Sequence, residues 1–238
     1  NLLLLSISTV LIAAAGYIVN DYYDVKIDYI NKPERVVIGR SITRRYAILF
    51  HVVFSAIGIL IGVYLSWSIA AVNILSVFLL WLYSNNLKRQ PFVGNLAVAL
   101  LTGASIFVVD MLYRTHNPLI IIYALFAIFM TLVREIIKDI EDLKGDNTFG
   151  CKTLPIIWGI RKTKIIIYTI LGIFSIAVIV LNTRFEILPL QYYVLLLFAP
   201  LVWFVVRLYR ADTKKDFSWL STFCKAIMLV GILSMVFA

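Results

Sequence analysis

The stretch Leu2–Asp28, LLLLSISTVLIAAAGYIVNDYYDVKID, passes directly from an apolar run into a group of acidic side chains. The apolar part is long enough to cross a bilayer as a helix. If the helix continues, Asn20, Asp24 and Asp28 recur at every fourth position and share one face, with Asp21 at its edge. Carboxylates in the middle of an apolar span are costly. The pattern therefore predicts a membrane helix that ends in a polar site.

A second acidic stretch, Arg134–Asp146, follows another long apolar segment. Its carboxylates at Glu135, Asp139, Asp142 and Asp146 step by four, three and four residues, so they share a narrow face for as long as the helix persists. Lysine and arginine residues are interleaved with them, which suits a site for a metal-bound polyanion. Mg²⁺ prefers one or two carboxylates plus substrate phosphate oxygens. The alternative for either stretch alone is a solvated, acidic helix end.

The composition places the chain in a membrane. Of its 238 residues, 62% are hydrophobic and 15% are charged, with a mean hydropathy of +0.94. These values are too apolar for a soluble domain of this length. We predict an all-α, polytopic bundle in a single domain, residues 1–238, with eight membrane segments: Leu2 to Val19, Tyr46 to Trp67, Ile69 to Tyr83, Val93 to Leu112, Leu119 to Val133, Ile165 to Leu181, Leu188 to Val206, and Trp219 to Phe237.

The distribution of positive charge predicts the orientation of this bundle. Almost all of the 22 lysine and arginine residues fall in alternate connections, and the other connections hold only Arg114 and Arg184. By the positive-inside rule the basic connections are cytoplasmic. Both acidic stretches lie on that side, in two long connections at about 20–45 and 134–164. Long connections commonly carry function.

Three sets of residues resemble signatures of the UbiA superfamily of intramembrane prenyltransferases. The first is Asn20–Asp28 (N-D-x-x-D-x-x-x-D), followed by Asn31–Arg35 (N-K-P-x-R). The second is Asp139–Asp146 (D-x-x-D-x-x-x-D), followed by Gly150–Pro155 (G-C-K-T-L-P), in a form similar to that of geranylgeranylglyceryl phosphate geranylgeranyltransferases. The third is Tyr83–Arg89 (Y-S-x-x-L-K-R).

The resemblance implies a bundle of nine helices around a central cavity that opens laterally toward lipid. The two aspartate-rich loops would cap this cavity on the cytoplasmic side. Eight segments are visible, so the resemblance implies that a first helix precedes Asn1 and that the native N-terminus is cytoplasmic. Because that helix helps to line the cavity in the family, the acceptor side of the site is the part least defined by this sequence.

The resemblance also implies an activity. We expect Mg²⁺-dependent transfer of a polyprenyl group, geranylgeranyl in the first instance, from its diphosphate to a lipophilic acceptor. The expected acceptor is geranylgeranylglyceryl phosphate, in ether-lipid synthesis. The alternatives are an aromatic acid of quinone biosynthesis, a porphyrin, a chlorophyll-type alcohol, or a terpene cyclase with no second substrate. A divalent-cation transporter is disfavoured, because its acids would lie near the bilayer midplane.

The expected partners are the isoprenyl diphosphate donor, the acceptor and the membrane lipids of the cell membrane. No nucleic acid and no obligate protein partner is predicted. Position by position, the family signatures imply a Mg²⁺ site made of Asn20, Asp21, Asp24, Asp139, Asp142 and Asp146. Basic candidates for the diphosphate oxygens are Lys88, Arg134, Lys138 and Lys152.

Four further residues have more than one possible role. Asp28 is expected either to complete the metal site or to assist deprotonation of the acceptor hydroxyl. Tyr83 either offers a π face to the developing carbocation or is an interfacial aromatic residue. Lys32 and Arg35 either bind a phosphate on the acceptor or only set the topology.

Overall fold

The computed structural model describes residues 1–185 and 198–234. The described residues form the α-helices α1 (Leu2–Asn31), α2 (Arg44–Leu65), α3 (Trp67–Asn85), α4 (Val93–Tyr113), α5 (Pro118–Glu141), α6 (Leu143–Thr148), α7 (Leu154–Phe185), α9 (Ala199–Arg210) and α10 (Lys214–Ser234), with two 3₁₀ turns, η1 (Pro33–Arg35) and η2 (Leu87–Arg89). Among them, α1 to α5, α7 and α10 are long and apolar enough to cross a bilayer. The predicted all-α, multi-span fold is confirmed.

The last predicted spans differ in how far they are described. The segment Trp219 to Phe237 corresponds to α10, described as far as Ser234. The segment Leu188 to Val206 lies outside the described residues up to Leu197, and its remainder belongs to α9.

Two helices run well past their predicted spans and carry the acidic stretches with them. Helix α1 continues from Val19 to Asn31, and α5 continues from Val133 to Glu141. The parts of the chain that we expected to be cytoplasmic loops are therefore largely helical. The shared face from Glu135 to Asp146 was expected for as long as the helix persists, and α5 ends at Glu141, where the short helix α6 follows it.

Helix α7 was also predicted too short, since it begins at Leu154 rather than near Ile165. It is interrupted at Gly159, where φ is 77°. Glycine adopts this left-handed conformation at little cost, which explains a break in an otherwise regular helix at that position. The charged residues that follow Gly159 concealed this extension in a sequence read by hydrophobicity alone.

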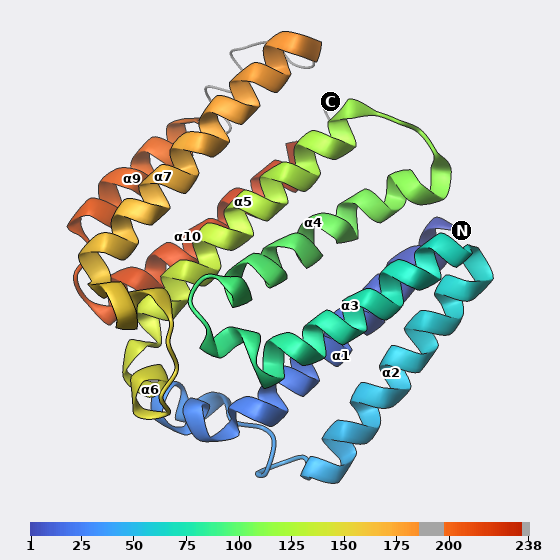
Figure 1. The fold of residues 1–238 in the computed structure, drawn as a ribbon, viewed down its shortest axis with the longest axis horizontal. Helices are drawn as coiled ribbons and strands as arrows, with labels where there is room; N and C mark the ends of the chain where they lie inside the picture. Colours follow the sequence, from blue (N-terminus) through green and yellow to red (C-terminus); the bar gives the residue numbers. More distant parts are fainter. Residues whose placement is uncertain (186–197, 235–238) are drawn as a thin grey trace.

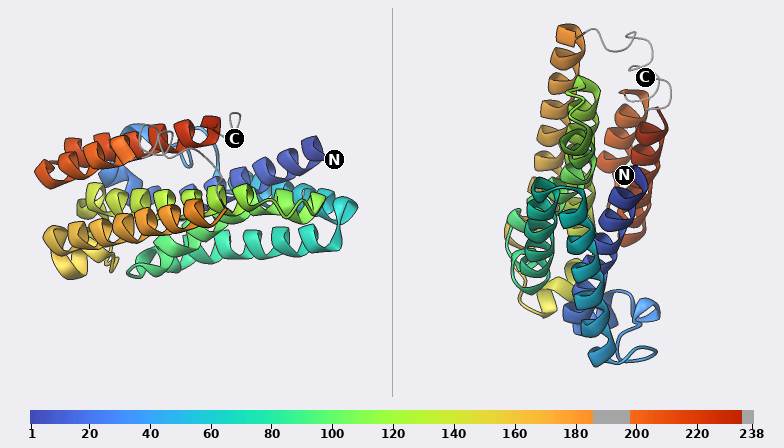
Figure 2. Two further views of the ribbon diagram at one scale, coloured as in Figure 1. Left: turned by 90° about the horizontal axis from the view of Figure 1, so that it is seen from above. Right: turned by 90° about the vertical axis from the view of Figure 1, so that its right-hand side faces the viewer.

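The long helices run side by side with a common tilt (Figure 1). Helix α1 packs against α2 and α3, α4 packs against α5, and α5 also packs against α7 and α10. The far ends of α1 and α5 meet α6 at one end of the bundle (Figure 1). The right-hand view of Figure 2 places the connection between α1 and α2 beyond that same end of the helices.

The close packing of α1, α2 and α3 depends on small and polar residues. The Ser8 hydroxyl donates to the Gly58 carbonyl at 2.8 Å, and the Asn73 amide donates to both Ser8 and Gly58. Gly58 and Gly62 form a G-x-x-x-G pair on α2, a spacing that lets membrane helices approach closely. This contact holds the apolar half of α1 and thereby fixes the direction of its acidic end.

Candidate active site

A cavity of about 360 Å³ lies where the ends of α1, α5 and α6 meet η2. All but two of the residues that we predicted for the site line it. They are Asn20, Asp21, Asp24, Asp28, Lys32, Tyr83, Lys88, Arg134, Lys138, Asp139, Asp142 and Asp146. The three motifs, far apart in the sequence, thus surround one space.

One wall of the cavity is the acidic end of α1. Asn20, Asp24 and Asp28 all line it, because residues four apart on a helix lie on the same side. The facing lysine comes from η2: Lys88 Nζ lies 2.5 Å from Asp24 Oδ1 and donates to Asn20 Oδ1 at 3.5 Å. Both charged side chains of this pair are mostly buried. An ammonium group therefore neutralises this part of the acidic wall.

The position of Lys88 depends on a close contact between η2 and α4. Gly94, near the start of α4, is buried, and a Cβ atom there would lie 2.7 Å from the Leu87 carbonyl oxygen and 2.9 Å from Lys88 Cα. The backbone N–H of Lys152 adds a second contact by donating to the Arg89 carbonyl at 2.8 Å. The backbone on each side of η2 thus holds Lys88 toward α1.

The opposite wall comes from the end of α5 and from α6. Lys32, just after α1, lies 2.9 Å from Asp142 Oδ2 and 3.6 Å from Glu141. The other Asp142 oxygen, Oδ1, is buried and has no hydrogen-bond partner among the described residues. A buried carboxylate oxygen without a partner is costly unless a cation or donor is supplied. A cation or a hydrogen-bond donor that bound at Asp142 would therefore provide the partner that Oδ1 lacks.

The electrostatics around α6 also favour the binding of a cation. Burial, followed by the negative charges of Asp142 and Asp24, raises the pKa of Asp146 to about 7, although Lys88 and Lys138 oppose the shift. Burial is the largest cause of this shift, and the neighbouring carboxylates add to it. A divalent cation bound beside Asp146 would favour its ionised form.

Further along α5, toward the middle of that helix, the cavity is lined by a second set of charges. Glu135 is buried, and its two oxygens contact Arg134 Nη1 at 2.5 Å and Lys138 Nζ at 3.3 Å. Asp139 accepts a hydrogen bond from the buried Asn95 amide at 2.9 Å. These contacts fix Arg134, Lys138 and Asp139 on the cavity side of α5.

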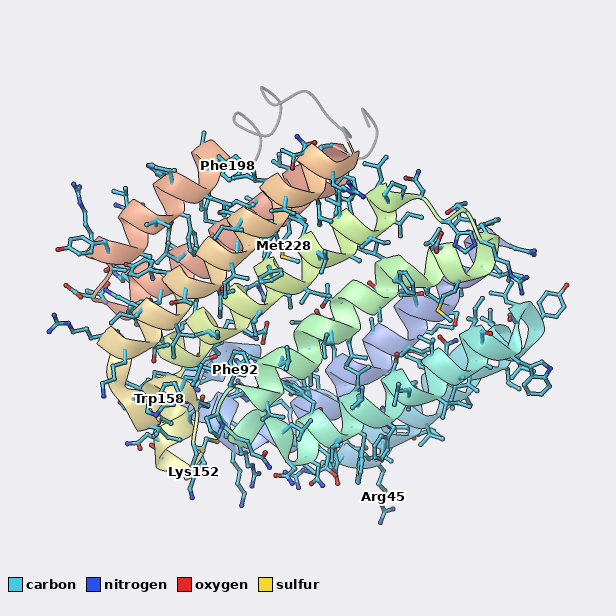
Figure 3. The ribbon with its side chains drawn as sticks, turned by 45° about the horizontal axis from the view of Figure 1, so that its top comes forward. Arg45, Phe92, Lys152, Trp158, Phe198 and Met228 are labelled. Carbon is cyan, nitrogen blue, oxygen red and sulfur yellow. The ribbon has the colours of Figure 1, made fainter. Side chains whose placement is uncertain are left out.

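The two remaining predicted residues are Lys152 and Arg35. The Lys152 side chain is exposed and lies at the outer edge of the bundle (Figure 3), so its contact with this structure is made by its backbone. Arg35 belongs to η1, but its side chain lies outside the described part of the structure. Lys152 is not among the residues that line the cavity.

Three residues with evident roles in the site were not predicted. Asn31 and Asn95 are buried amides that contact the acidic segments, and Glu135 holds two cations in place. Asn31 belongs to a recognised motif and Glu135 to a recognised acidic face, so a signal existed for both. Nothing in the sequence distinguishes Asn95 from other polar residues in membrane helices.

The donor set suits Mg²⁺, although no group of three His, Cys, Asp or Glu residues converges on one point among the described residues. Mg²⁺ is usually bound through one or two carboxylates together with phosphate oxygens and water. Acids spread over two walls of one cavity fit that mode of binding. The unpartnered Asp142 oxygen and the raised pKa of Asp146 support the same fit.

Fold and cavity together define a multi-span membrane protein with a site of carboxylates and cations suited to a metal-bound phosphorylated ligand. The chain belongs to the UbiA prenyltransferase family, which it matches over residues 1–229. The family resemblance inferred from the motifs is confirmed, and with it the class of enzyme, a prenyltransferase.

Individual relatives agree with this assignment. A digeranylgeranylglyceryl phosphate synthase of Methanosphaera stadtmanae is 34% identical over 237 residues, which cover 98% of this chain and 86% of the relative. A solved structure of a digeranylgeranylglyceryl phosphate synthase has a TM-score of 0.73 at 24% identity, covering 98% of this chain and 83% of that chain. A UbiA homolog from Archaeoglobus fulgidus bound to GPP and Mg²⁺ has a TM-score of 0.74 at 14% identity, covering 97% and 86%.

Proposed function

We propose that this enzyme transfers a geranylgeranyl group from geranylgeranyl diphosphate to geranylgeranylglyceryl phosphate, with Mg²⁺ as cofactor and the cavity facing the cytoplasm. The observation that carries the proposal is one cavity lined by both acidic motifs and by lysines from three separate segments. The similarity of the chain to relatives named digeranylgeranylglyceryl phosphate synthase supports this acceptor over an aromatic acid. The basic connections beside the cavity support its orientation.

In this proposal the chain binds the donor diphosphate with cations that already face the cavity. Lys88, Arg134 and Lys138 supply N–H donors to its oxygens, and charge-assisted hydrogen bonds of this kind are the strong ones. Lys152 was a further candidate, but its exposed side chain gives that role no support from the geometry. The side-chain oxygens of Asn20, Asp24, Asp142 and Asp146 would hold Mg²⁺, with Asp21 and Asp139 beside them.

The reaction breaks the bond between the allylic C1 carbon and the diphosphate oxygen, and pyrophosphate leaves with the bonding electrons. When bound, Mg²⁺ stabilises the negative charge that develops on this leaving group. The acceptor hydroxyl oxygen then forms an ether bond to C1 and gives up its proton. Tyr83, whose ring lines the cavity, is our candidate for stabilising the cation through its π face.

Asp28 and Lys32 are the candidates on the acceptor side. Asp28 lies one turn beyond Asp24 on the same wall, where a carboxylate either joins the metal ligands or accepts the hydroxyl proton. Lys32 lies at the far end of α1 beside Asp142, and together with Arg35 it is our candidate for binding the acceptor phosphate. These roles require the acceptor headgroup to enter beside the segment that follows α1.

The test is to incubate the purified protein in lipid with geranylgeranyl diphosphate and Mg²⁺ and to identify products by mass. The acceptors offered separately are geranylgeranylglyceryl phosphate, dihydroxynaphthoate and 4-hydroxybenzoate. We expect a diether product with the first acceptor alone. A prenylated aromatic acid would move the enzyme to quinone biosynthesis. Steady pyrophosphate release with no transfer to any acceptor would identify a cyclase.

A further inference from the structure

Asn31, the last residue of α1, joins three segments of the chain. Its side-chain oxygen Oδ1 accepts a hydrogen bond from the backbone N–H of Gly145 in α6, at 3.0 Å. Its backbone oxygen accepts a hydrogen bond from the Lys214 ammonium, at the start of α10, at 2.9 Å. Asn31 is 8% exposed, so these bonds form in a largely water-free environment.

The contact with α6 leaves no room for a side chain at position 145. A Cβ atom on Gly145 would lie 2.5 Å from Asn31 Oδ1 and closer still to Nδ2. The three nearest heavy atoms all belong to the Asn31 side chain. The absence of a side chain at Gly145 thus lets the α6 backbone approach α1 closely, and Asn31 Oδ1 accepts the hydrogen bond from that backbone.

The contact between Asn31 and Gly145, which we call the joint, lies between the two acidic walls of the cavity. Asp24 and Asp28 precede Asn31 on α1, whereas Asp142 and Asp146 flank Gly145 on the other side. The ion pair of Lys32 with Asp142 also links the two walls, but Lys32 is a candidate for binding an anion and would then exchange its partner. The amide of Asn31 has no such competing role.

We propose that Asn31 is a positioning residue that sets the distance between the two acidic walls, and through it the affinity for the divalent cation. The proposal rests on the proposed function, because it requires that both walls contribute metal ligands. Ligating oxygens must be held within about 0.5 Å of the productive geometry. A neutral hydrogen bond between the two backbones that carry them provides that constraint whether or not the lysines change partners.

The direct test is Asn31→Ala. We expect the dissociation constant for Mn²⁺, measured by isothermal titration in the presence of an unreactive thiolo analogue of the donor, to rise about 10- to 100-fold. Residues that orient metal ligands without touching the metal typically have effects of this size. At saturating Mg²⁺ we expect kcat to remain within a few-fold of the wild-type value, because Asn31 is not a catalytic residue in this proposal.

A matched control separates positioning from a general loss of stability. Asn117 Oδ1 accepts a hydrogen bond from the Leu119 N–H, also at 3.0 Å, at the opposite end of α5. Asn117→Ala removes the same kind of bond far from the cavity and should leave Mn²⁺ affinity unchanged. If both variants lower the unfolding temperature and neither changes Mn²⁺ affinity, the proposal is wrong.

A double substitution tests the joint itself. Gly145→Ala should weaken Mn²⁺ binding because its methyl group meets the Asn31 side chain, whereas Gly172→Ala, with no atom near its Cβ position, should not. In the Asn31→Ala background the new methyl group has room, so Gly145→Ala should cost little more. Fully additive losses would show that the two residues act independently and would overturn the proposal.

These measurements remain interpretable if the proposed acceptor is wrong. If the wild-type protein binds Mn²⁺ with the donor analogue but makes no diether, the proposed function is wrong. The role of Asn31 is then still tested by the effect of Asn31→Ala on Mn²⁺ affinity. Wild-type protein that makes the diether, with Mn²⁺ affinity unchanged by Asn31→Ala, contradicts the joint alone.

Discussion

At the scale of single residues, the ion pairs in the cavity involve the same carboxylates that we propose as metal ligands. Asp24 contacts Lys88 and Asp142 contacts Lys32, so each acid has an ammonium partner in the absence of other cations. Binding of a divalent cation with the donor diphosphate allows the acids to exchange a lysine for the metal, while the lysines turn to phosphate oxygens. The charges on the two lysines stay neutralised throughout such an exchange.

Removing one carboxylate at a time tests this arrangement. We expect Asp24→Asn and Asp142→Asn each to raise the Mg²⁺ concentration for half-maximal turnover at least about tenfold, because a metal ligand is lost from either wall. The measurement is initial rate of prenyl transfer against Mg²⁺ concentration.

The control for these variants is Asp110→Asn. Asp110 lies near the end of α4 and accepts hydrogen bonds from Thr115 and the His116 N–H, away from the residues that line the cavity. The Mg²⁺ dependence of this variant should match that of the wild type. Full Mg²⁺-dependent turnover by either cavity variant would contradict our metal assignment.

The acids that line the cavity are easier to recognise in the sequence than the amides that contact the acidic segments. A run of carboxylates after an apolar span is visible without a structure, because its cost in a membrane is so high. The contacts of Asn31 with Gly145 and of Asn95 with Asp139 depend on how distant helices pack. Amides are common in loops and helices alike, so Asn95 did not stand out before the packing was known, and the motif that contains Asn31 did not indicate its contact with Gly145.

At the scale of elements, the two acidic helices are longer than a bilayer requires. Helix α1 has 30 residues, or about 45 Å at 1.5 Å per residue, whereas the hydrocarbon core is about 30 Å thick. The extra turns carry the acids beyond the apolar span without interrupting the helix. Their spacing predicted the shared face on α1 because a regular helix continues through it. The same spacing holds on α5 only as far as Glu141, where that helix ends, since chain breaks depend on local backbone geometry.

The approach of α4 to η2 gives a prediction at this scale. Gly94→Ala should displace η2, because the new methyl group would meet backbone atoms of Leu87 and Lys88 that no side-chain rotation can move aside. We expect a lower unfolding temperature and an increase of roughly tenfold or more in KM for the donor, since Lys88 is a proposed diphosphate ligand. Both quantities are measured on purified protein in detergent.

Gly172→Ala provides the comparison for Gly94→Ala. This exposed glycine of α7 has open space around its Cβ position. Alanine there should be neutral or slightly stabilising, since it favours a helix by up to about 1 kcal/mol over glycine. Equal effects of the two substitutions would show that η2 does not depend on its contact with Gly94.

The polar contact between α1, α2 and α3 gives a second prediction. Asn73→Leu removes the hydrogen bonds to Ser8 and Gly58 and introduces a larger apolar side chain beside Gly62. We expect a loss of about 0.6 to 2 kcal/mol in unfolding free energy, the range found for interhelical hydrogen bonds in membranes. Unfolding in mixed micelles of increasing denaturing detergent measures this difference.

The control here is Thr169→Val on α7. Thr169 is exposed, and its hydroxyl donates to the Ile165 carbonyl of its own helix. Its substitution removes a hydrogen bond without affecting contact between helices, so stability should change little. If Asn73→Leu has no larger effect than this control, the polar contact does not hold α1 in place.

At the scale of the whole molecule, hydropathy and charge predicted the class of fold because each span must satisfy its own backbone inside the membrane. The turn between α2 and α3 at Ser66 agrees with the two separate spans, Tyr46 to Trp67 and Ile69 to Tyr83, that we predicted for this region. The cavity could not be predicted from hydropathy, because it is formed by the ends of helices that are far apart in the sequence. Family motifs indicated which residues to bring together, and the packing of α1, α5 and α6 shows how they meet.

The orientation of the molecule is the last prediction, and it can be tested by labelling from one side of the membrane. Arg45 is exposed in the first turn of α2, directly after the basic connection beside the cavity, whereas Trp67 is exposed at the turn at the opposite end of α2. The positive-inside rule places Arg45 in the cytoplasm. A membrane-impermeant maleimide should therefore modify Arg45→Cys in inside-out vesicles and Trp67→Cys in right-side-out vesicles. The wild-type protein sets the background, since both of its cysteines are buried. The reverse pattern would place the cavity outside the cell and contradict our proposal that the donor diphosphate enters from the cytoplasm.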